Sequence, residues 1–207
     1  MRLKIGPRAL LALLVLAAAC GTEGAIEDSP SPAASVASVL SLEDARWSGK
    51  WEFDYALVKL EGVAENETNF TLGSKIGRVW EVTPGCPEGP CTSEILASDP
   101  DKPQDAPTKS VINYDGGSYR IIQTFPPEPG QGCVAGNGRV IPAAFEATNA
   151  VEVKPTRFVE SEGGAVVTEL FAVKTTTFRP SGTASGAGGT CVMKTAVWEG
   201  PVRPAPS

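Results

Sequence analysis

The 207-residue sequence contains no histidine. Without an imidazole, the chain cannot assemble the Ser-His-Asp or Cys-His pairs that activate many hydrolytic nucleophiles, and it lacks the commonest protein ligand for zinc and copper. Basic residues are also few, at 18 against 24 acidic residues, and they form no cluster. This balance argues against nucleic acid and anionic lipid surfaces as partners. We therefore predict a protein that is not an enzyme and that has no cofactor and no bound metal.

Long apolar runs are absent as well, except for one near the N-terminus. Residues 9–19 are entirely apolar, follow three basic residues (Arg2, Lys4 and Arg8) and end in small side chains directly before Cys20. This is the pattern of a cleaved secretory signal, and the run is about half as long as a bilayer span. The predicted mature chain therefore begins at Cys20.

The cysteine at this boundary resembles the lipobox of bacterial lipoproteins. The resemblance implies that the Cys20 sulfur carries a diacylglycerol with fatty chains such as palmitate, and that the protein is anchored to the extracytoplasmic face of the cell membrane. Two acyl chains hold a protein at a membrane far more firmly than one. An ordinary signal peptide that leaves Cys20 as a free thiol is the alternative.

Cysteine occurs an odd number of times, five in all. A secreted protein with one unpaired cysteine carries a reactive thiol into an oxidising compartment, so assigning Cys20 to lipid leaves an even set. Cys86 and Cys91 are separated by four residues rich in proline and glycine, a spacing that permits a disulfide. We predict this pair, which leaves Cys133 with Cys191. Crossed pairs and a four-cysteine zinc site are the alternatives.

The sequence divides into three parts. Residues 1–19 are the predicted signal peptide, residues 20–43 a lipid-anchored flexible linker rich in Ser, Ala, Pro and acidic residues, and residues 44–207 a β-barrel domain with a short disordered C-terminal tail. The linker composition buries too little apolar surface to order the chain. At its end, Ser41 and Asp44 have the spacing of a cap for one short helical turn.

The dominant period after Gly49 is two, and no stretch keeps a helical period. Trp51, Phe53 and Tyr55 alternate with Glu52 and Asp54, which predicts a strand with one buried face. Similar patterns predict further strands at residues 75–83, 91–97, 110–114, 118–125, 151–159, 165–178 and 191–198. The glycine pairs in Asp115-Gly116-Gly117 and Glu162-Gly163-Gly164 predict two hairpins. We predict an all-β fold, an antiparallel up-and-down barrel of about eight strands, with a β-sandwich as the alternative.

The segment Gly49-Lys50-Trp51, at the start of the first predicted strand, is similar to the G-x-W signature of calycins, the lipocalin and avidin group of ligand-binding barrels. The resemblance implies that Trp51 closes one end of the barrel and packs against a basic residue from the last strand. Lys194 and Arg203 are the candidates for that residue.

A second resemblance involves the segment from Trp80 to Cys91. Its pattern, Trp-x-x-x-Pro-x-Cys-x-x-Gly-x-Cys, is similar to one found in uncharacterised secreted lipoproteins of actinobacteria. That family has no established activity, so the resemblance bears on the source of the chain and leaves its function open.

We predict a binding function for the barrel. The apolar phase of its strands supplies the candidate lining for a small apolar ligand: Trp51, Phe53, Tyr55, Trp80, Tyr119, Ile121, Phe125 and Phe178. The same side chains would fill a solid barrel, because small eight-stranded barrels are often packed by side chains alone. The alternative is therefore a structural or interaction lipoprotein that binds an envelope protein and no small ligand. A cavity of a few hundred cubic ångströms distinguishes the two.

Acidic residues allow two further alternatives. A hydrolase that uses paired carboxylates would draw on Glu52, Asp54, Glu81, Glu94 and Glu169, which fall mostly on the polar phase of their strands. Asp99, Asp101 and Asp105 place three carboxylates in one loop, but the spacing of a calcium-binding EF-hand is absent, and we predict a solvated loop.

Overall fold

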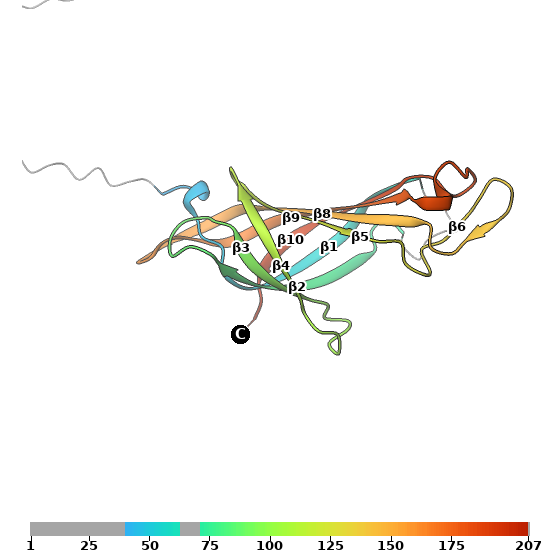
Figure 1. The fold of residues 1–207 in the computed structure, drawn as a ribbon. Coiled ribbons are helices and arrows are strands. Elements are labelled where there is room, and N and C mark those ends of the chain that lie inside the picture. The colour runs from blue at the N-terminus through green and yellow to red at the C-terminus, as the bar shows by residue number, and fades with distance from the viewer. Residues whose placement is uncertain (1–39, 63–70, 207) are drawn as a thin grey trace, which may run out of the picture. The chain divides into compact units, whose positions relative to one another are not determined.

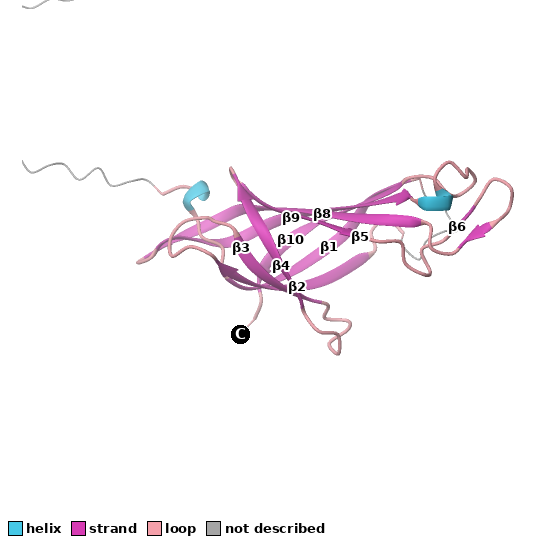
Figure 2. Cartoon of the chain, viewed as in Figure 1, coloured by secondary structure: helices cyan, strands magenta, loops and turns pink. Residues whose placement is uncertain are grey.

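The computed structural model describes residues 40–62 and 71–206, and Figure 2 shows that this part of the chain is dominated by β-strands. The predicted signal peptide, Cys20 and the linker up to residue 39 lie outside the described residues. A short 3-10 turn, η1 (Leu42–Asp44), precedes the first strand. The amide and the hydroxyl of Ser41 both donate hydrogen bonds to the Asp44 carboxylate, at 3.0 and 2.8 Å, so the predicted cap is confirmed.

Eight strands close into an antiparallel barrel (Figure 1). The strands are β1 (Gly49–Glu61), β2 (Lys75–Pro84), β3 (Ser93–Ser98), β4 (Thr108–Asp115), β5 (Ser118–Phe125), β8 (Phe145–Ser161), β9 (Gly164–Pro180) and β10 (Lys194–Pro204). Their order around the barrel is β1-β10-β9-β8-β5-β4-β3-β2, so neighbours in sequence are neighbours in space. The predicted up-and-down barrel is confirmed, and the alternative β-sandwich is wrong.

The alternation along β1 explains why this segment forms a barrel strand. Trp51, Phe53 and Tyr55 are buried inside the barrel, while Glu52 and Asp54 are exposed on its outer face. Successive side chains of a strand point to opposite faces, so one apolar phase is sufficient to fill the interior. Closing the sheet also removes the unpaired edges that long strands otherwise expose.

Both predicted hairpins are confirmed. Gly116 and Gly117 turn the chain from β4 into β5 with φ of 50° and 108°, conformations that glycine adopts without steric cost. The second turn joins the two longest strands, β8 and β9, where Ser161 pairs with Gly164.

An insertion between β5 and β8 was not predicted. It contains β6 (Cys133–Val134) and β7 (Val140–Ile141), which pair with each other and form a sheet separate from the barrel. Strands of two residues are too short to show a period in the sequence. Together with a second 3-10 turn, η2 (Gly182–Ala184), the insertion forms a small apolar cluster around the disulfide between Cys133 and Cys191.

The predicted bounds of the last strand were wrong. It was expected at residues 191–198 but runs from Lys194 to Pro204. Pairing with β9 on one side and β1 on the other continues the ladder past Trp198 to Pro204, which lies opposite Trp51. Tertiary pairing thus overrides the strand-breaking signal of Gly200 and Pro201. The C-terminal tail predicted to be disordered does not begin before residue 205, since the strand itself reaches residue 204.

The two ends of the barrel differ. At the closed end, where β1 begins and β2 ends, Trp47 is fully buried against Trp51, Trp80 and Tyr119. At the opposite end, the mouth, β1 ends and β2 begins. The loop between β3 and β4 borders this opening. The aromatic cluster around Trp47 therefore fills one end of the barrel, and the other end is the place to look for a binding site.

Candidate functional site

The mouth of the barrel contains a pocket of about 300 Å³. Its apolar wall consists of inward-facing side chains from several strands: Trp80, Ile95, Ala97, Ile121, Phe125 and Val151. Polar and charged side chains complete the lining: Tyr55, Arg78, Ser98, Asp99, Asp105, Thr108, Ser110, Gln123, Asn149 and Lys174, with Ala106 in the adjoining loop. The pocket thus combines an apolar wall with polar groups, and small-molecule sites use both: apolar side chains for contact area and polar groups for orientation.

Tyr55 carries an unsatisfied polar group into this pocket. Its side chain is 1% exposed, and its hydroxyl has no hydrogen-bond partner among the described residues. Burial raises the pKa of Tyr55, and the positive charge of Arg78 acts in the opposite direction. The phenol is therefore neutral at ordinary pH and has a hydrogen bond to donate.

Lys174 is an inward-facing cation on β9. It lies in phase with the buried Ala172 and Thr176, opposite Val151 on β8 and Trp198 on β10. No carboxylate of the described residues comes within salt-bridge distance of its ammonium group. Burial, and secondarily the charge of Arg78, lower the pKa of Lys174 to about 8, so at neutral pH the group is still charged.

Arg78 is the second cation of the pocket and has a partner. Its guanidinium lies 3.1 Å from the Asp99 carboxylate and donates a hydrogen bond of 2.6 Å to the Gly77 carbonyl. Asp99 also accepts a hydrogen bond from the Asp101 amide at 3.0 Å. The acidic loop predicted to be solvated thus contributes one carboxylate to a salt bridge. The described residues contain no cluster of three or more metal-ligating side chains.

The remaining polar groups of the wall largely satisfy one another. Gln123 donates to the Ser110 hydroxyl at 2.8 Å, and the Thr176 hydroxyl donates to Asn149 at 2.7 Å. Buried polar groups are normally paired in this way. Among the described residues of the pocket, the Tyr55 hydroxyl is the only buried polar side-chain atom without a hydrogen-bond partner, and the Lys174 ammonium forms no salt bridge.

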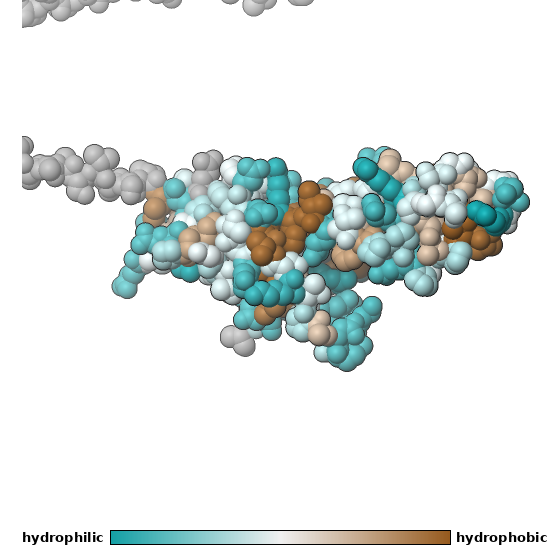
Figure 3. Space-filling model, in the orientation of Figure 1, coloured by the Kyte–Doolittle hydropathy of each residue, from teal (hydrophilic) through white to brown (hydrophobic). Residues whose placement is uncertain are grey.

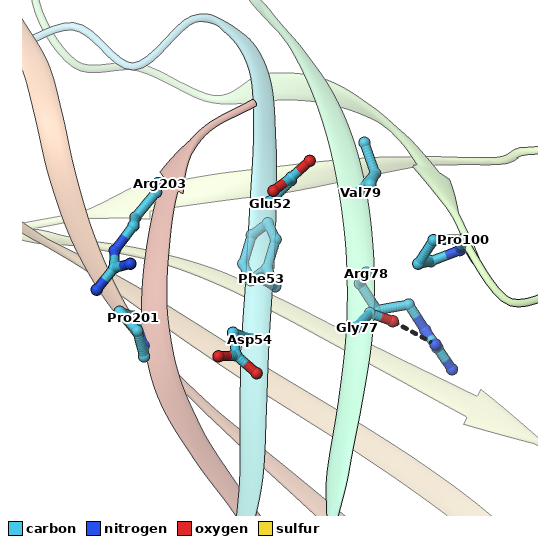
Figure 4. Close-up of a pocket in the computed structure, with 9 residues that line it drawn as sticks. All are labelled: Glu52, Phe53, Asp54, Gly77, Arg78, Val79, Pro100, Pro201 and Arg203. Carbon is cyan, nitrogen blue, oxygen red and sulfur yellow. Dashed lines mark hydrogen bonds between the residues drawn. The ribbon is translucent and has the colours of Figure 1, made fainter. Parts of the chain in front are cut away.

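A second hollow, of about 420 Å³, lies on the outer face of the barrel. Figure 4 shows Glu52 and Asp54 on β1, with Pro201 and Arg203 from β10 on one side and Pro100 on the other. Glu52, Asp54 and Arg203 are exposed to water, and Arg78, which also lines this hollow, pairs with Asp99. This outer hollow has no buried polar group without a partner, and the mouth pocket is the stronger candidate.

Half of the predicted lining belongs to the mouth pocket. Tyr55, Trp80, Ile121 and Phe125 line it. The other four side chains lie elsewhere: Trp51 and Tyr119 at the closed end, Phe53 against the Trp80 ring at 4.2 Å between centroids, and Phe178 against the cluster of the insertion.

Sequence analysis missed Arg78 and Lys174. The signal that identifies them is their phase: Arg78 is two residues before Trp80, and Lys174 is two residues after Ala172. A charged residue on the apolar phase of a strand points into the barrel.

Trp51 lies where the calycin resemblance implies, but no basic residue of the last strand lies where the resemblance implies. Trp51 is buried at the closed end, and its indole N–H donates to the Ser48 carbonyl at 2.8 Å. Lys194, at the mouth end of β10, lies over the Phe145 ring at 4.8 Å from its centroid. Arg203 is exposed on the outer face and pairs in register with Glu52. Neither cation therefore occupies the position that the resemblance implies.

Comparison of the chain with protein-family models, with curated proteins and with solved structures finds no significant match. Within residues 40–62 and 71–206, no helix has the length and apolarity needed to cross a membrane.

Proposed function

We propose that the chain is a lipid-anchored binding protein of the extracytoplasmic membrane face, whose barrel mouth holds a small and largely apolar molecule. The observation that carries the proposal is the pocket of about 300 Å³ between Trp80, Ile121 and Phe125. The pocket is concave and places apolar side chains next to polar groups, which is the setting in which small-molecule sites occur. The volume lies at the lower end of the range for small-molecule sites.

Binding of a neutral apolar fluorophore, N-phenyl-1-naphthylamine, tests this proposal. We expect saturable binding with one molecule per chain and a blue shift of its emission. Ala97→Phe places a ring in the pocket and should weaken binding at least tenfold, because Ala97 lines the mouth. Leu96→Phe is the matched control, because Leu96 is the adjacent residue of β3 and is exposed on the outer face.

Two results would contradict the proposal. The first is the absence of saturable binding to the wild-type domain. The second is equal binding by the Ala97→Phe and Leu96→Phe variants, which would place the fluorophore on the barrel surface. Native mass spectrometry of protein purified from its own host gives an independent measurement, with a bound small molecule as the expected result.

The lipid anchor is tested separately from the pocket. With radiolabelled palmitate in the growth medium, we expect the full-length protein to incorporate label and to sediment with membranes. Cys20→Ala should abolish both, because the other four cysteines of the sequence form the disulfides Cys86–Cys91 and Cys133–Cys191. Label that persists in the Cys20→Ala variant would contradict acylation at this residue.

A second candidate function is the binding of an envelope protein. Its supporting observation is a group of exposed apolar side chains on neighbouring strands, Leu96, Val111 and Ile122, the last of which is 72% exposed. Apolar patches interrupt a mostly hydrophilic face in Figure 3. Such patches mark interaction sites when they are contiguous. This function does not use the mouth pocket, so it predicts that Ala97→Phe has no effect on it.

Hydrolysis by paired carboxylates has no comparable support. The candidate acids Glu52, Asp54, Glu81, Glu94 and Glu169 are all exposed. Solvated carboxylates on an outer face lack the differing environments that separate an acid from a base. The proposal therefore assigns no catalytic step to the chain.

A further inference from the structure

We infer that the mouth pocket recognises a carboxylate on an apolar body, and that the Lys174 ammonium and the Tyr55 hydroxyl bind this group. The inference rests on the proposed function, because it names the class of ligand for the same pocket. It follows from the buried Tyr55 hydroxyl, which has no hydrogen-bond partner among the described residues, and from the Lys174 ammonium, which forms no salt bridge with them.

One of the two cations that line the mouth pocket, Lys174, has no salt bridge with the described residues. Arg78 is neutralised by Asp99 at 3.1 Å, but Lys174 has no carboxylate of the described residues within 4.0 Å. Asp105 also lines the pocket, but it is exposed in the loop between β3 and β4. Partly buried cations in proteins are normally paired. An anionic ligand would supply the missing partner of Lys174.

The Tyr55 hydroxyl is the second group that would contact the carboxylate. It is buried on β1 and lines the same pocket as Lys174 on β9. The charge of Arg78 acts on both groups, so each of them lies within electrostatic range of Arg78 in the pocket that all three line. A phenol that remains neutral retains an O–H that can be donated to an acceptor. A carboxylate offers two acceptor oxygens, one for the ammonium and one for the phenol.

The charged side chains of the lining favour a ligand with a single negative charge. Of the four charged side chains of the described lining, Arg78 and Asp99 form a salt bridge, which leaves Lys174 as the one cation without a salt bridge and Asp105 as an exposed carboxylate. A monoanion pairs with Lys174, whereas the second charge of a phosphate monoester dianion would find no further cation and would be repelled by Asp105. The adjoining wall of Trp80, Ile95 and Val151 would cover the apolar part of the molecule. The chemistry therefore fits a monocarboxylic acid with a hydrocarbon body.

Displacement of N-phenyl-1-naphthylamine by three compounds with one hydrocarbon chain tests this inference. We expect decanoate to displace the fluorophore at about ten- to hundredfold lower concentration than decanol, because hydrogen bonds to charged groups are the strong ones. Decyl phosphate should displace the fluorophore less readily than decanoate, because the Asp105 carboxylate of the pocket repels its second negative charge. Equal potency of decanoate and decanol would overturn the inference, and decyl phosphate as the strongest competitor would overturn the choice of a carboxylate.

Lys174→Met should reduce the advantage of decanoate over decanol to about twofold or less, because methionine fills similar space without charge. The affinity for the neutral fluorophore should remain, which also reports that the variant is folded. Lys154→Met is the matched control: it removes one lysine from the outer face of β8, where Lys154 pairs with Glu152, and should retain the full advantage. Tyr55→Phe should reduce the advantage by about three- to tenfold, the loss of one hydrogen bond. An unchanged advantage in Lys174→Met would overturn the assignment.

The pH dependence gives a second readout. Raising the pH through about 8 should remove the decanoate advantage, because burial lowers the pKa of Lys174 to this value and its ammonium is lost. The other charged and titratable groups that face Lys174 in the pocket are Arg78, Asp99, Asp105 and Tyr55, and burial raises the pKa of Tyr55 further from this range. If the fluorophore does not bind at all, the proposed function fails. If it binds but decanoate has no advantage, only this inference fails.

Discussion

The indole of Trp47 and the phenol ring of Tyr119 meet edge to face, with their centroids 4.9 Å apart. Trp47 precedes β1 and enters the closed end of the barrel from the preceding segment. That segment is held by backbone hydrogen bonds from the Arg46 amide to Ala165 at 2.8 Å and from the Val167 amide to Arg46 at 3.0 Å. We call this segment, Arg46 and Trp47, the plug. It fills the closed end, and its hydrogen bonds to the start of β9 fix its position.

Trp47→Ala should destabilise the domain more than any other single truncation at the closed end. The side chain is fully buried and contacts Trp51 and Trp80 in addition to Tyr119. Replacing a buried tryptophan by alanine typically costs about 3–5 kcal/mol, because transfer and cavity terms add. Urea unfolding followed by fluorescence measures the change. Leu42→Ala, at an exposed residue of η1, is the control and should cost less than about 1 kcal/mol. A loss below that value for Trp47→Ala would show that the plug is dispensable.

The sequence was sufficient to predict the barrel but not its plug. The period of two along β1 and the glycines between β4 and β5 are local signals, and both predicted the observed structure. Trp47 stands alone before the first strand, so no period marks it as buried. The charged site was missed for a related reason: Arg78 and Lys174 are far apart in the chain, and only the closure of the barrel brings them to one pocket.

The two disulfides should differ in their contribution to stability. Cys133–Cys191 closes a loop with a sequence separation of 58, and Cys86–Cys91 closes one of 5. The loss of loop-closure entropy in the unfolded chain predicts about 4 kcal/mol for the long link and about 2 kcal/mol for the short one. Double alanine variants of each pair, unfolded in urea under identical conditions, measure the difference. An equal loss for both would mean that native contacts, and not chain entropy, decide their effects.

Gly200 should tolerate no larger residue. Its Cα approaches the Asp54 carbonyl of β1 so closely that a Cβ would overlap backbone atoms. Relief would require β1 and β10 to separate, at the seam where the barrel closes. We expect Gly200→Ala to destabilise the domain by about 1–3 kcal/mol, the usual cost of overpacking. Gly163→Ala is the control, because a Cβ there meets open space, and it should be neutral or slightly stabilising. Matching thermal midpoints for the two variants would contradict this view of the seam.

Stability should rise with pH between about 8 and about 10. Burial lowers the pKa of Lys174 to about 8 in the folded protein, whereas the unfolded chain has the ordinary value near 10.4. Between these values the unfolded chain binds more protons than the folded one, so the free energy of unfolding increases with pH. Below about 8 the lysine is charged in both states, and its burial lowers stability by a constant amount. Lys174→Met should therefore increase the thermal midpoint at pH 7 and abolish the increase in stability between about pH 8 and about pH 10. Lys154→Met should leave this pH-dependent increase unchanged.

Above about pH 10, stability should instead fall as the pH increases, because tyrosines of the unfolded chain lose their protons there. Burial raises the pKa of Tyr119 to about 12 and raises the pKa of Tyr55 as well, so the folded protein retains both phenol protons at that pH. The folded state then binds more protons, and stability falls as the pH increases further. Thermal midpoints from pH 7 to 11 should thus pass through a maximum near 10. Tyr55→Phe should make the descent shallower and leave the rise below it unchanged, because the rise belongs to Lys174. A monotonic curve across this range would contradict the burial of these three groups.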